Sequence, residues 1–203
     1  MAPSEWSEPK LGGYDWRVDH AIIADGDLNL SVSERASGQV QTNGAANATN
    51  ALWEVDVTLP QMRDGLIAAP IWTFNSKTFD EIDFEVVGRT GLHLTVWTAV
   101  GGRHTAVWSD LVIRGDLSGR RFRLGIAYEA GKRIRFFVDG RVVADIGPED
   151  MSQGFPTTPQ KPYFDLWVAN GLDPAWAGRW SPLPRGERLT MRVHGYRAGP
   201  VPQ

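Results

Sequence analysis

The stretch FDEIDFEVVG, at positions 79–88, decides the fold class. Within it, the acidic residues Glu81, Asp83 and Glu85 alternate with apolar residues. Successive side chains of a β-strand point to opposite faces of a sheet, so a period of two is typical of a strand. The stretch therefore predicts a strand with one apolar face against a core and three carboxyl groups on the other face.

The same alternation recurs on both sides of this stretch, and turns that contain Gly and Asp separate the segments. The other alternating segments are 27–33, 53–59, 92–97 and 133–138. Asp139-Gly140 lies between two apolar runs and predicts a hairpin, whereas residues 147–153 could form one helical turn. Many short strands in a chain of about 200 residues predict an all-β protein, a β-sandwich or jelly roll.

Length and composition restrict the classes of protein to consider. The 203 residues suit one domain over 1–203, with 1–15 as an N-terminal arm and 198–203 as a C-terminal tail. The 21 Lys and Arg and the 24 Asp and Glu form no block of like charge, which argues against a nucleic-acid-binding protein. The absence of cysteine excludes disulfides, cysteine-ligated zinc and a thiol nucleophile. No run of about 18 apolar residues could span a membrane.

Three acids on one face of a strand repel one another, so the pattern needs an explanation. One explanation is a solvated sheet face. The other is glycoside hydrolysis, which in retaining enzymes requires two carboxyl groups about 5–5.5 Å apart. The Cα atoms of Glu81 and Glu85 would lie about 13 Å apart on an extended strand, and their long side chains could lean together. Asp83 between them would raise the proton affinity of one neighbour.

Nine tryptophans against four tyrosines indicate that some indoles face a ligand. The apolar faces of sugar rings stack on aromatic rings, which makes several tryptophans candidates for a sugar cleft. These candidates are Trp72, Trp97, Trp108, Trp167, Trp176 and Trp180. We expect Trp53 in the core, and Trp6 and Trp16 as packing anchors for the N-terminal strand.

Two of the four histidines lie near the candidate cleft. His93 alternates with Trp97 along the segment LHLTVW, so we expect it to face the cleft and to bind sugar hydroxyls. His104 follows a Gly-Gly-Arg turn, and we expect its ring to be either hydrogen-bonded within the protein or exposed to solvent. No H-x-H or H-x-x-x-H pair exists, so we expect no zinc site.

Several stretches, in order along the chain, resemble glycoside hydrolase family 16, the group of laminarinases, lichenases and xyloglucan transferases. The catalytic strand of that family reads E-x-D-x-E, or E-x-D-x-x-E with a bulge, and residues 81–85 have the unbulged form. The matching flanks are SGQVQT at 37–42, WEVDVTLP at 53–60, GLIAAPIWTF at 65–74, FFVDG at 136–140, and DLW at 165–167 followed by Trp176. These stretches stand in the order of the family, and the resemblance covers roughly residues 37–197.

The resemblance implies a jelly-roll β-sandwich of the concanavalin A type, with a concave sheet that forms an open substrate cleft. It implies that Glu81 is the nucleophile, Glu85 the acid/base and Asp83 the assisting acid. The resemblance also implies that five residues contact the substrate, namely Glu54, Phe79, Trp97, Asp165 and Trp167.

Two departures from the family pattern bear on the site. Asn50-Ala51-Leu52 stands where the family has Y-G-R, so the subsites nearby can differ. His194 stands at the position of an Asp that holds a structural calcium in many members. A neutral imidazole is a poor ligand for a hard, oxygen-seeking ion, so we expect no metal and no cofactor.

We therefore predict a retaining endo-β-glycanase that hydrolyses internal bonds of a polysaccharide, either a β-glucan or a bacterial exopolysaccharide. The alternatives are a non-catalytic carbohydrate-binding or surface module, such as a virion component, and a transglycosylase. We expect a monomer whose partner is a polysaccharide, without nucleic acid or membrane. We expect an extracellular or periplasmic location, although residues 1–10 lack the basic-then-apolar pattern of a signal peptide.

Overall fold

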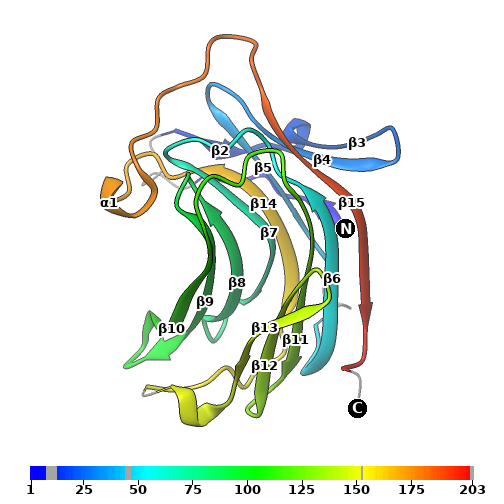
Figure 1. The fold of residues 1–203 in the computed structure, drawn as a ribbon, viewed down its shortest axis with the longest axis vertical. Coiled ribbons are helices and arrows are strands. Elements are labelled where there is room, and N and C mark those ends of the chain that lie inside the picture. Colours follow the sequence, from blue (N-terminus) through cyan, green and yellow to red (C-terminus); the bar gives the residue numbers. More distant parts are fainter. Residues whose placement is uncertain (8–12, 44–46, 152, 202–203) are drawn as a thin grey trace.

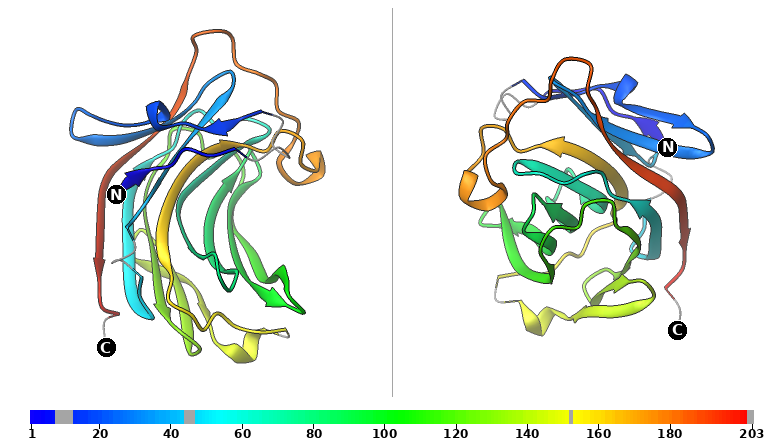
Figure 2. Two further views of the ribbon diagram at one scale, coloured as in Figure 1. Left: turned by 180° about the vertical axis from the view of Figure 1, so that it is seen from behind. Right: turned by 45° about the horizontal axis from the view of Figure 1, so that its top comes forward.

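The computed structural model of the protein describes residues 1–7, 13–43, 47–151 and 153–201. Two sheets of mainly antiparallel strands pack against each other, and the strands of the first sheet are strongly bent (Figures 1 and 2). Helical structure among the described residues is short, as in the helix α1 (Pro174–Ala177) and the 3₁₀ turn Pro148–Asp150. This architecture confirms the predicted all-β jelly-roll sandwich.

The first sheet carries the acidic stretch near its middle. Its strand order is β1 (Ala2–Pro3), β5 (Ala36–Gln41), β14 (Lys161–Val168), β7 (Leu66–Asn75), β8 (Asp80–Val87), β9 (Gly91–Val100) and β10 (Arg103–Arg114). The short strand β2 (Asp15–Trp16) pairs in parallel with β5. The strands β7 to β10 follow one another in the chain, whereas β14 joins β7 to β5 from a distant part of it, so the sheet brings together residues that the sequence separates.

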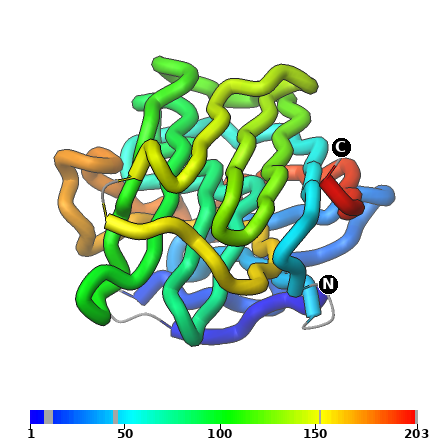
Figure 3. Tube along the Cα trace, turned by 90° about the horizontal axis from the view of Figure 1, so that it is seen from below, coloured from blue at the N-terminus to red at the C-terminus, as the bar shows by residue number. Residues whose placement is uncertain are grey.

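The second sheet covers the apolar side of the first. Its strand order is β13 (Arg141–Ile146), β12 (Arg133–Val138), β11 (Arg121–Glu129), β6 (Asn50–Thr58), β15 (Leu189–Gly199), β4 (Asp27–Val32) and β3 (Ala21–Ala24). The N-terminal residues and the end of β15 lie on the same side of the molecule (Figures 1 and 3).

The core lies between the sheets, and β8 shows why the acidic stretch forms a strand. Ile82, Phe84 and Val86 are fully buried, and Phe84 meets Phe136 of β12 edge-on at 5.1 Å between ring centroids. Fully burying such a side chain contributes about 1.5–3 kcal/mol. Since these residues occupy every second position, the alternating acids must point to the opposite face, as the period of two predicted.

The other predicted segments also form strands, in β4, β6, β9 and β12. Asp139-Gly140 forms the predicted hairpin turn, and both residues have positive φ angles of 51° and 79°. The predicted C-terminal tail is wrong at its start, because Ala198 and Gly199 still belong to β15 and pair with Trp53 and Leu52. Within the described residues, no helix has the length and apolar character needed to cross a membrane.

Candidate active site

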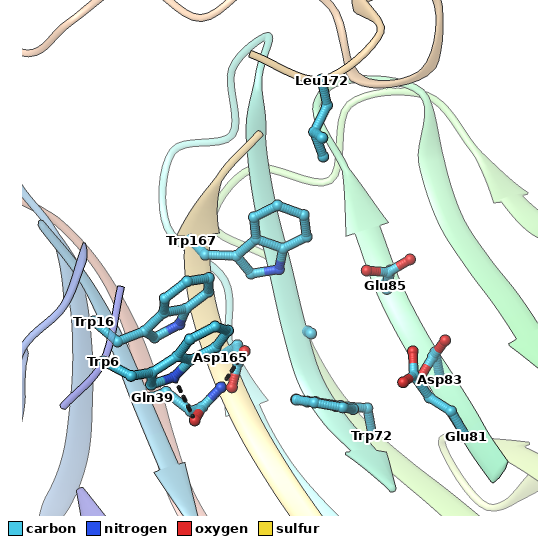
Figure 4. A pocket seen from close by; sticks show the side chains of 11 residues that line it. Trp6, Trp16, Gln39, Trp72, Glu81, Asp83, Glu85, Asp165, Trp167 and Leu172 are labelled. Atoms are coloured by element: carbon cyan, nitrogen blue, oxygen red, sulfur yellow. Dashed lines mark hydrogen bonds between the residues drawn. The ribbon is translucent and has the colours of Figure 1, made fainter. Parts of the chain in front are cut away.

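The three acids of β8 line a cavity of about 290 Å³ on the face of the first sheet that points away from the core (Figure 4). Side chains from β8, β7, β14, β5 and the N-terminal residues form its walls. The lining residues are Trp6, Trp16, Gln39, Ala69, Trp72, Glu81, Asp83, Glu85, Asp165, Trp167 and Leu172. Four of these residues are carboxylic acids, and four are tryptophans.

Strand register explains how these residues meet. Trp72 of β7 stands opposite Asp83 of β8, and Ala69 of β7 stands opposite Asp165 of β14. The strand β7 therefore lies between the two acidic strands. The small side chain of Ala69 leaves room for the cavity between Asp165 and the acids of β8.

Asp83 is the most enclosed acid of the trio, with 3% of its surface exposed. Trp97 Nε1, on the neighbouring strand β9, donates a hydrogen bond of 2.8 Å to Asp83 Oδ2. Burial, together with the charges of Glu81 and Glu85, raises the pKa of Asp83 well above its usual range.

The interaction between the side chains of Asp83 and Glu81 acts on the two acids in opposite directions, since it raises the pKa of Asp83 and lowers that of Glu81. Asp83 Oδ1 is buried and has no hydrogen-bond partner. Asp83 therefore favours the ionised form of Glu81, whereas burial and the charge of Glu85 oppose it.

The two glutamates are protonated more readily than free glutamate. Burial, and then the charge of Glu85, raises the pKa of Glu81 to about 8. Burial raises the pKa of Glu85 to about 7. Because the acids repel one another, they lose their protons one after another, and near neutral pH the site holds both protonated and ionised carboxyl groups.

Asp165 is a fourth buried acid on the opposite wall. Gln39 Nε2 donates a 2.9 Å hydrogen bond to Asp165 Oδ2. Burial raises the pKa of Asp165 to about 7, although Gln39 and the nearby indole N–H groups of Trp72 and Trp16 lower it. Asp165 Oδ1 has no hydrogen bond of good geometry, which leaves it available to a ligand.

On the other side of Glu81, His104 of β10 lies within an aromatic cluster. Its Nε2 is 3.6 Å from Glu81 Oε2, and its ring centroid is 4.9 Å from that of Trp97 and 5.9 Å from that of Phe79. Burial lowers the pKa of His104, which favours the neutral imidazole. The sequence analysis gave this histidine no role, because residues 81 and 104 are brought together only by the β8–β9–β10 pairing.

The family model of the glycosyl hydrolases family 16 matches residues 13–182. The chain belongs to glycosyl hydrolase family 16. A β-glucanase of Brevibacillus brevis is 23% identical over 188 residues, which cover 85% of this chain and 67% of that protein.

Two solved structures have the same fold at low sequence identity. A prokaryotic β-1,3-1,4-glucanase (lichenase) from a mouse hindgut metagenome has a TM-score of 0.72 at 20% identity, over 93% of this chain and 87% of that one. A transglycosylase has a TM-score of 0.68, also at 20% identity, over 90% and 76% of the two chains.

The family 16 fold brings most of the predicted site residues to one face. Trp72, Asp165 and Trp167 line the cavity with the acidic trio, and Trp97 bonds to Asp83. Phe79 has a positive φ of 59° in the turn before β8 and lies beside His104 at the rim, with 41% of its surface exposed. Trp176 of α1 lies 6.1 Å from Trp167.

The prediction for Glu54 is wrong. Glu54 lies on β6 of the second sheet, not on the first sheet, and its carboxylate accepts a hydrogen bond from Arg197 Nε. The buried residues of β6, such as Trp53 and Val55, point into the core, so Glu54 must point outward. His93 stands opposite Glu85 in register, but its Nε2 hydrogen-bonds with Thr90 and it does not line the cavity.

Five lining residues were not predicted from the sequence, namely Trp6, Trp16, Gln39, Ala69 and Leu172. Trp6 and Trp16 were expected only as packing anchors, and Gln39 was noted only as part of a motif. The two indoles stack at 4.1 Å between centroids and 3° between planes, and Trp6 Nε1 donates a 3.3 Å hydrogen bond to Gln39 Oε1. The surplus of tryptophan was the only signal, and it did not say which indoles face the cleft.

The residues around His194 do not fit a calcium ion. The two ring nitrogens of His194 are used by Asp27 Oδ2, at 2.9 Å, and Thr58 Oγ1, at 2.7 Å. A calcium ion needs several converging oxygen ligands, and here the imidazole occupies the space between the two oxygens. Among the described residues there is also no group of three or more His, Asp or Glu that could hold a metal ion.

Proposed function

We propose that this family 16 protein is a retaining glycoside hydrolase that cleaves internal bonds of a neutral or substituted β-glycan. The observation that carries the proposal is the closely spaced trio of Glu81, Asp83 and Glu85 in a tryptophan-lined cavity, where burial raises the pKa of each acid. Three acids without a lysine or arginine partner in one cavity are unfavourable for folding, so they are expected to take part in chemistry.

In the first step, the Glu81 carboxylate attacks the anomeric carbon, and a covalent glycosyl ester forms as the glycosidic C–O bond breaks. Glu85 gives its proton to the departing oxygen. In the second step, Glu85, now a carboxylate, takes a proton from water, whose oxygen attacks the anomeric carbon. The ester bond to Glu81 breaks, and both acids return to their starting states.

Two neighbours of Glu81 support this division of roles. Asp83 lowers the pKa of Glu81 and so favours the ionised form that a nucleophile needs. Trp97 fixes Asp83 from the other side. Burial raises the pKa of Glu85 to about 7, so it can hold a proton closer to neutral pH than a free glutamate does. The pKa of Glu81 is raised further, to about 8, so its attack requires that Glu81 first loses its own proton. The chemistry needs no cofactor.

Aromatic residues on both sides of the trio support cleavage within a chain. Trp167 and Trp176 lie on one side, and Trp97, His104 and Phe79 on the other. Sugar units could therefore stack on either side of the bond to be cleaved.

A transglycosylase is the second candidate, because the structural similarity includes a transglycosylase. The same covalent intermediate would then pass to a sugar hydroxyl instead of water. The polysaccharide, its linkage and the extracellular or periplasmic location remain predictions.

Product analysis tests the proposal. The wild type and Glu81→Gln are incubated with mixed-linkage glucan, laminarin, xyloglucan, agarose, carrageenan and an acidic exopolysaccharide, and mass spectrometry detects new oligosaccharides. We expect products from at least one polymer with the wild type and none with the variant. Equal products from both would refute the role of Glu81. Products longer than the substrate, from added oligosaccharide acceptors, would identify the transglycosylase.

A further inference from the structure

We propose that the N-terminal residues 2–6 and Trp16 complete a subsite for a neutral sugar unit at the far wall of the cavity. The inference rests on the proposed function, since it assigns part of the same cleft to the substrate. It goes further by giving the N-terminal residues a role in specificity and by stating the charge of the sugar that they accept.

The contacts of the N-terminal residues fix them to the edge of the first sheet. Ala2 and Pro3 pair with Gln41 and Val40 of β5, and the Ser4 amide donates to the Gln39 carbonyl at 3.0 Å. The backbones of Trp6 and Trp16 exchange two hydrogen bonds, of 3.2 and 2.9 Å. This segment is therefore held in place beside the cavity.

The two stacked indoles differ in exposure. Trp16 is buried, with 4% of its surface exposed, whereas Trp6 on top of it is 45% exposed. The outer indole is an apolar, rigid surface beside a carbohydrate cleft, and such a surface is suited to the apolar face of a pyranose ring. A role in core packing alone would not require Trp6 to be exposed.

Three buried polar atoms around this wall form no hydrogen bond of good geometry. They are Trp16 Nε1, Trp72 Nε1 and Asp165 Oδ1, and all three residues line the cavity. The two indoles lie close enough to Asp165 to lower its pKa, but their polar atoms are left poorly paired, which is unfavourable in a buried site. Two donors and one carboxyl oxygen match the hydroxyl groups of a sugar, which donate and accept at the same time.

The charges of the lining residues indicate a neutral sugar. Glu81, Asp83, Glu85 and Asp165 are acids, and none of the described residues that line the cavity is Lys or Arg. A sulfate or carboxylate group on the sugar would lie near Asp165 in a cavity rich in acids and would have no lysine or arginine partner. The subsite therefore selects against sulfated and uronic acid units.

The subsite is distinct from the position of the attacked sugar. The wall stands at β5, and the strands β14 and β7 lie between β5 and β8. The wall and the acids of β8 are therefore about three strand spacings, or ~14 Å, apart. A sugar unit against Trp6 is consequently not the unit that Glu81 attacks. Loss of the wall should weaken the binding of longer oligosaccharides without removing the reacting groups.

Binding to inactive protein tests the inference without relying on turnover. Calorimetry in a Glu81→Gln background compares Trp6→Ala with its parent, using tetra- to hexasaccharides of neutral β-glucans of several linkages and carrageenan oligosaccharides of similar length. We expect the parent to bind at least one neutral series and Trp6→Ala to bind it about tenfold more weakly. The charged oligosaccharides should bind more weakly than the neutral ones.

Two further variants separate recognition from folding. Glu34→Ala is the control, since Glu34 is exposed between β4 and β5 and does not line the cavity, and its affinity should equal that of the parent. Trp6→Phe keeps an aromatic face and should recover part of the loss, with an unchanged melting temperature. Equal affinity of Trp6→Ala and the parent, no binding of any neutral series, or preferred binding of carrageenan oligosaccharides would overturn the inference. Binding in this background is independent of whether the wild type cleaves the polymer.

Discussion

Acidic residues behave in opposite ways on the outer faces of the two sheets. On the second sheet, hydrogen bonds from Arg121 and Arg133 hold the pKa values of Asp56 and Asp145 below their usual range, and Glu54 is paired with Arg197. In the cleft of the first sheet, no arginine or lysine lines the cavity among the described residues, and burial raises the pKa values of the acids. Acids paired with arginine stay ionised and form surface ion pairs, whereas acids without a cationic partner are suited to proton transfer.

The largest expected effect compares one glutamate from each face. Glu85→Gln should lower the turnover of the polysaccharide about 10²–10⁴-fold, because the departing oxygen loses its proton donor. Glu54→Gln removes only a surface pair with Arg197 and should leave turnover near that of the wild type. Reducing-end assays of both variants measure the difference. A comparable loss in Glu54→Gln would mean that the second sheet takes part in catalysis.

The pH dependence of activity tests whether the acids of the cleft have raised pKa values. Turnover requires one carboxyl group ionised and one protonated, and the pKa values of Glu85 and Glu81 are raised to about 7 and about 8. We expect a bell-shaped profile of kcat/KM with its maximum near neutral pH, since the group that titrates first must ionise while the other keeps its proton. An optimum below pH 5 would show that the acids in the free enzyme are not shifted upward.

Stability should respond to pH in opposite directions on the two faces. The folded-state pKa of Asp165 is raised to about 7, against about 3.9 in the unfolded chain. The folded protein therefore binds this proton more tightly, and the resulting stability is present below pH 4 and is lost as the pH rises through 7. Asp165→Asn should reduce the loss of stability between pH 4 and pH 8 by roughly 2–4 kcal/mol.

Urea unfolding of the wild type and of Asp165→Asn at several pH values measures the contribution of Asp165 to the pH dependence of stability. Asp56→Asn is the matched control, because Arg121 lowers the pKa of Asp56. The contribution of Asp56 is present at neutral pH and is lost as the pH falls through its folded pKa. If Asp165→Asn followed the pH dependence of the wild type, the carboxyl group of Asp165 would not hold an excess proton in the folded protein.

The smallest effect is expected at the paired surface. Arg121 binds Asp56 through two hydrogen bonds of 2.8 and 2.7 Å, but the side chain of Arg121 is 61% exposed. Solvent screens such a pair, so Arg121→Ala should change the free energy of unfolding only slightly. Urea unfolding at low and high salt measures this change. A loss of stability comparable with that of a core substitution would show that the outer face depends on its ion pairs.

Much of the fold and part of the site could be predicted from local pattern. The period of two along 81–86 gave both the strand and the common face of its acids, because side-chain direction in a strand follows from the backbone alone. The prediction for Glu54 failed for a related reason. Its strand was predicted, but the alternation of 53–59 does not state which sheet the strand joins.

The sequence by itself determined the strands, the turn at Asp139-Gly140 and the acidic trio, because each depends on neighbours within a few residues. Only the tertiary structure decided that Trp6, Trp16 and Gln39 lie opposite the trio, that His104 reaches Glu81, and that Asp165 is buried without a cation. These contacts join strands distant in sequence, and their order depends on how two sheets bury their apolar faces against each other. The pKa shifts follow from the same burial, because they depend on which groups are removed from water together.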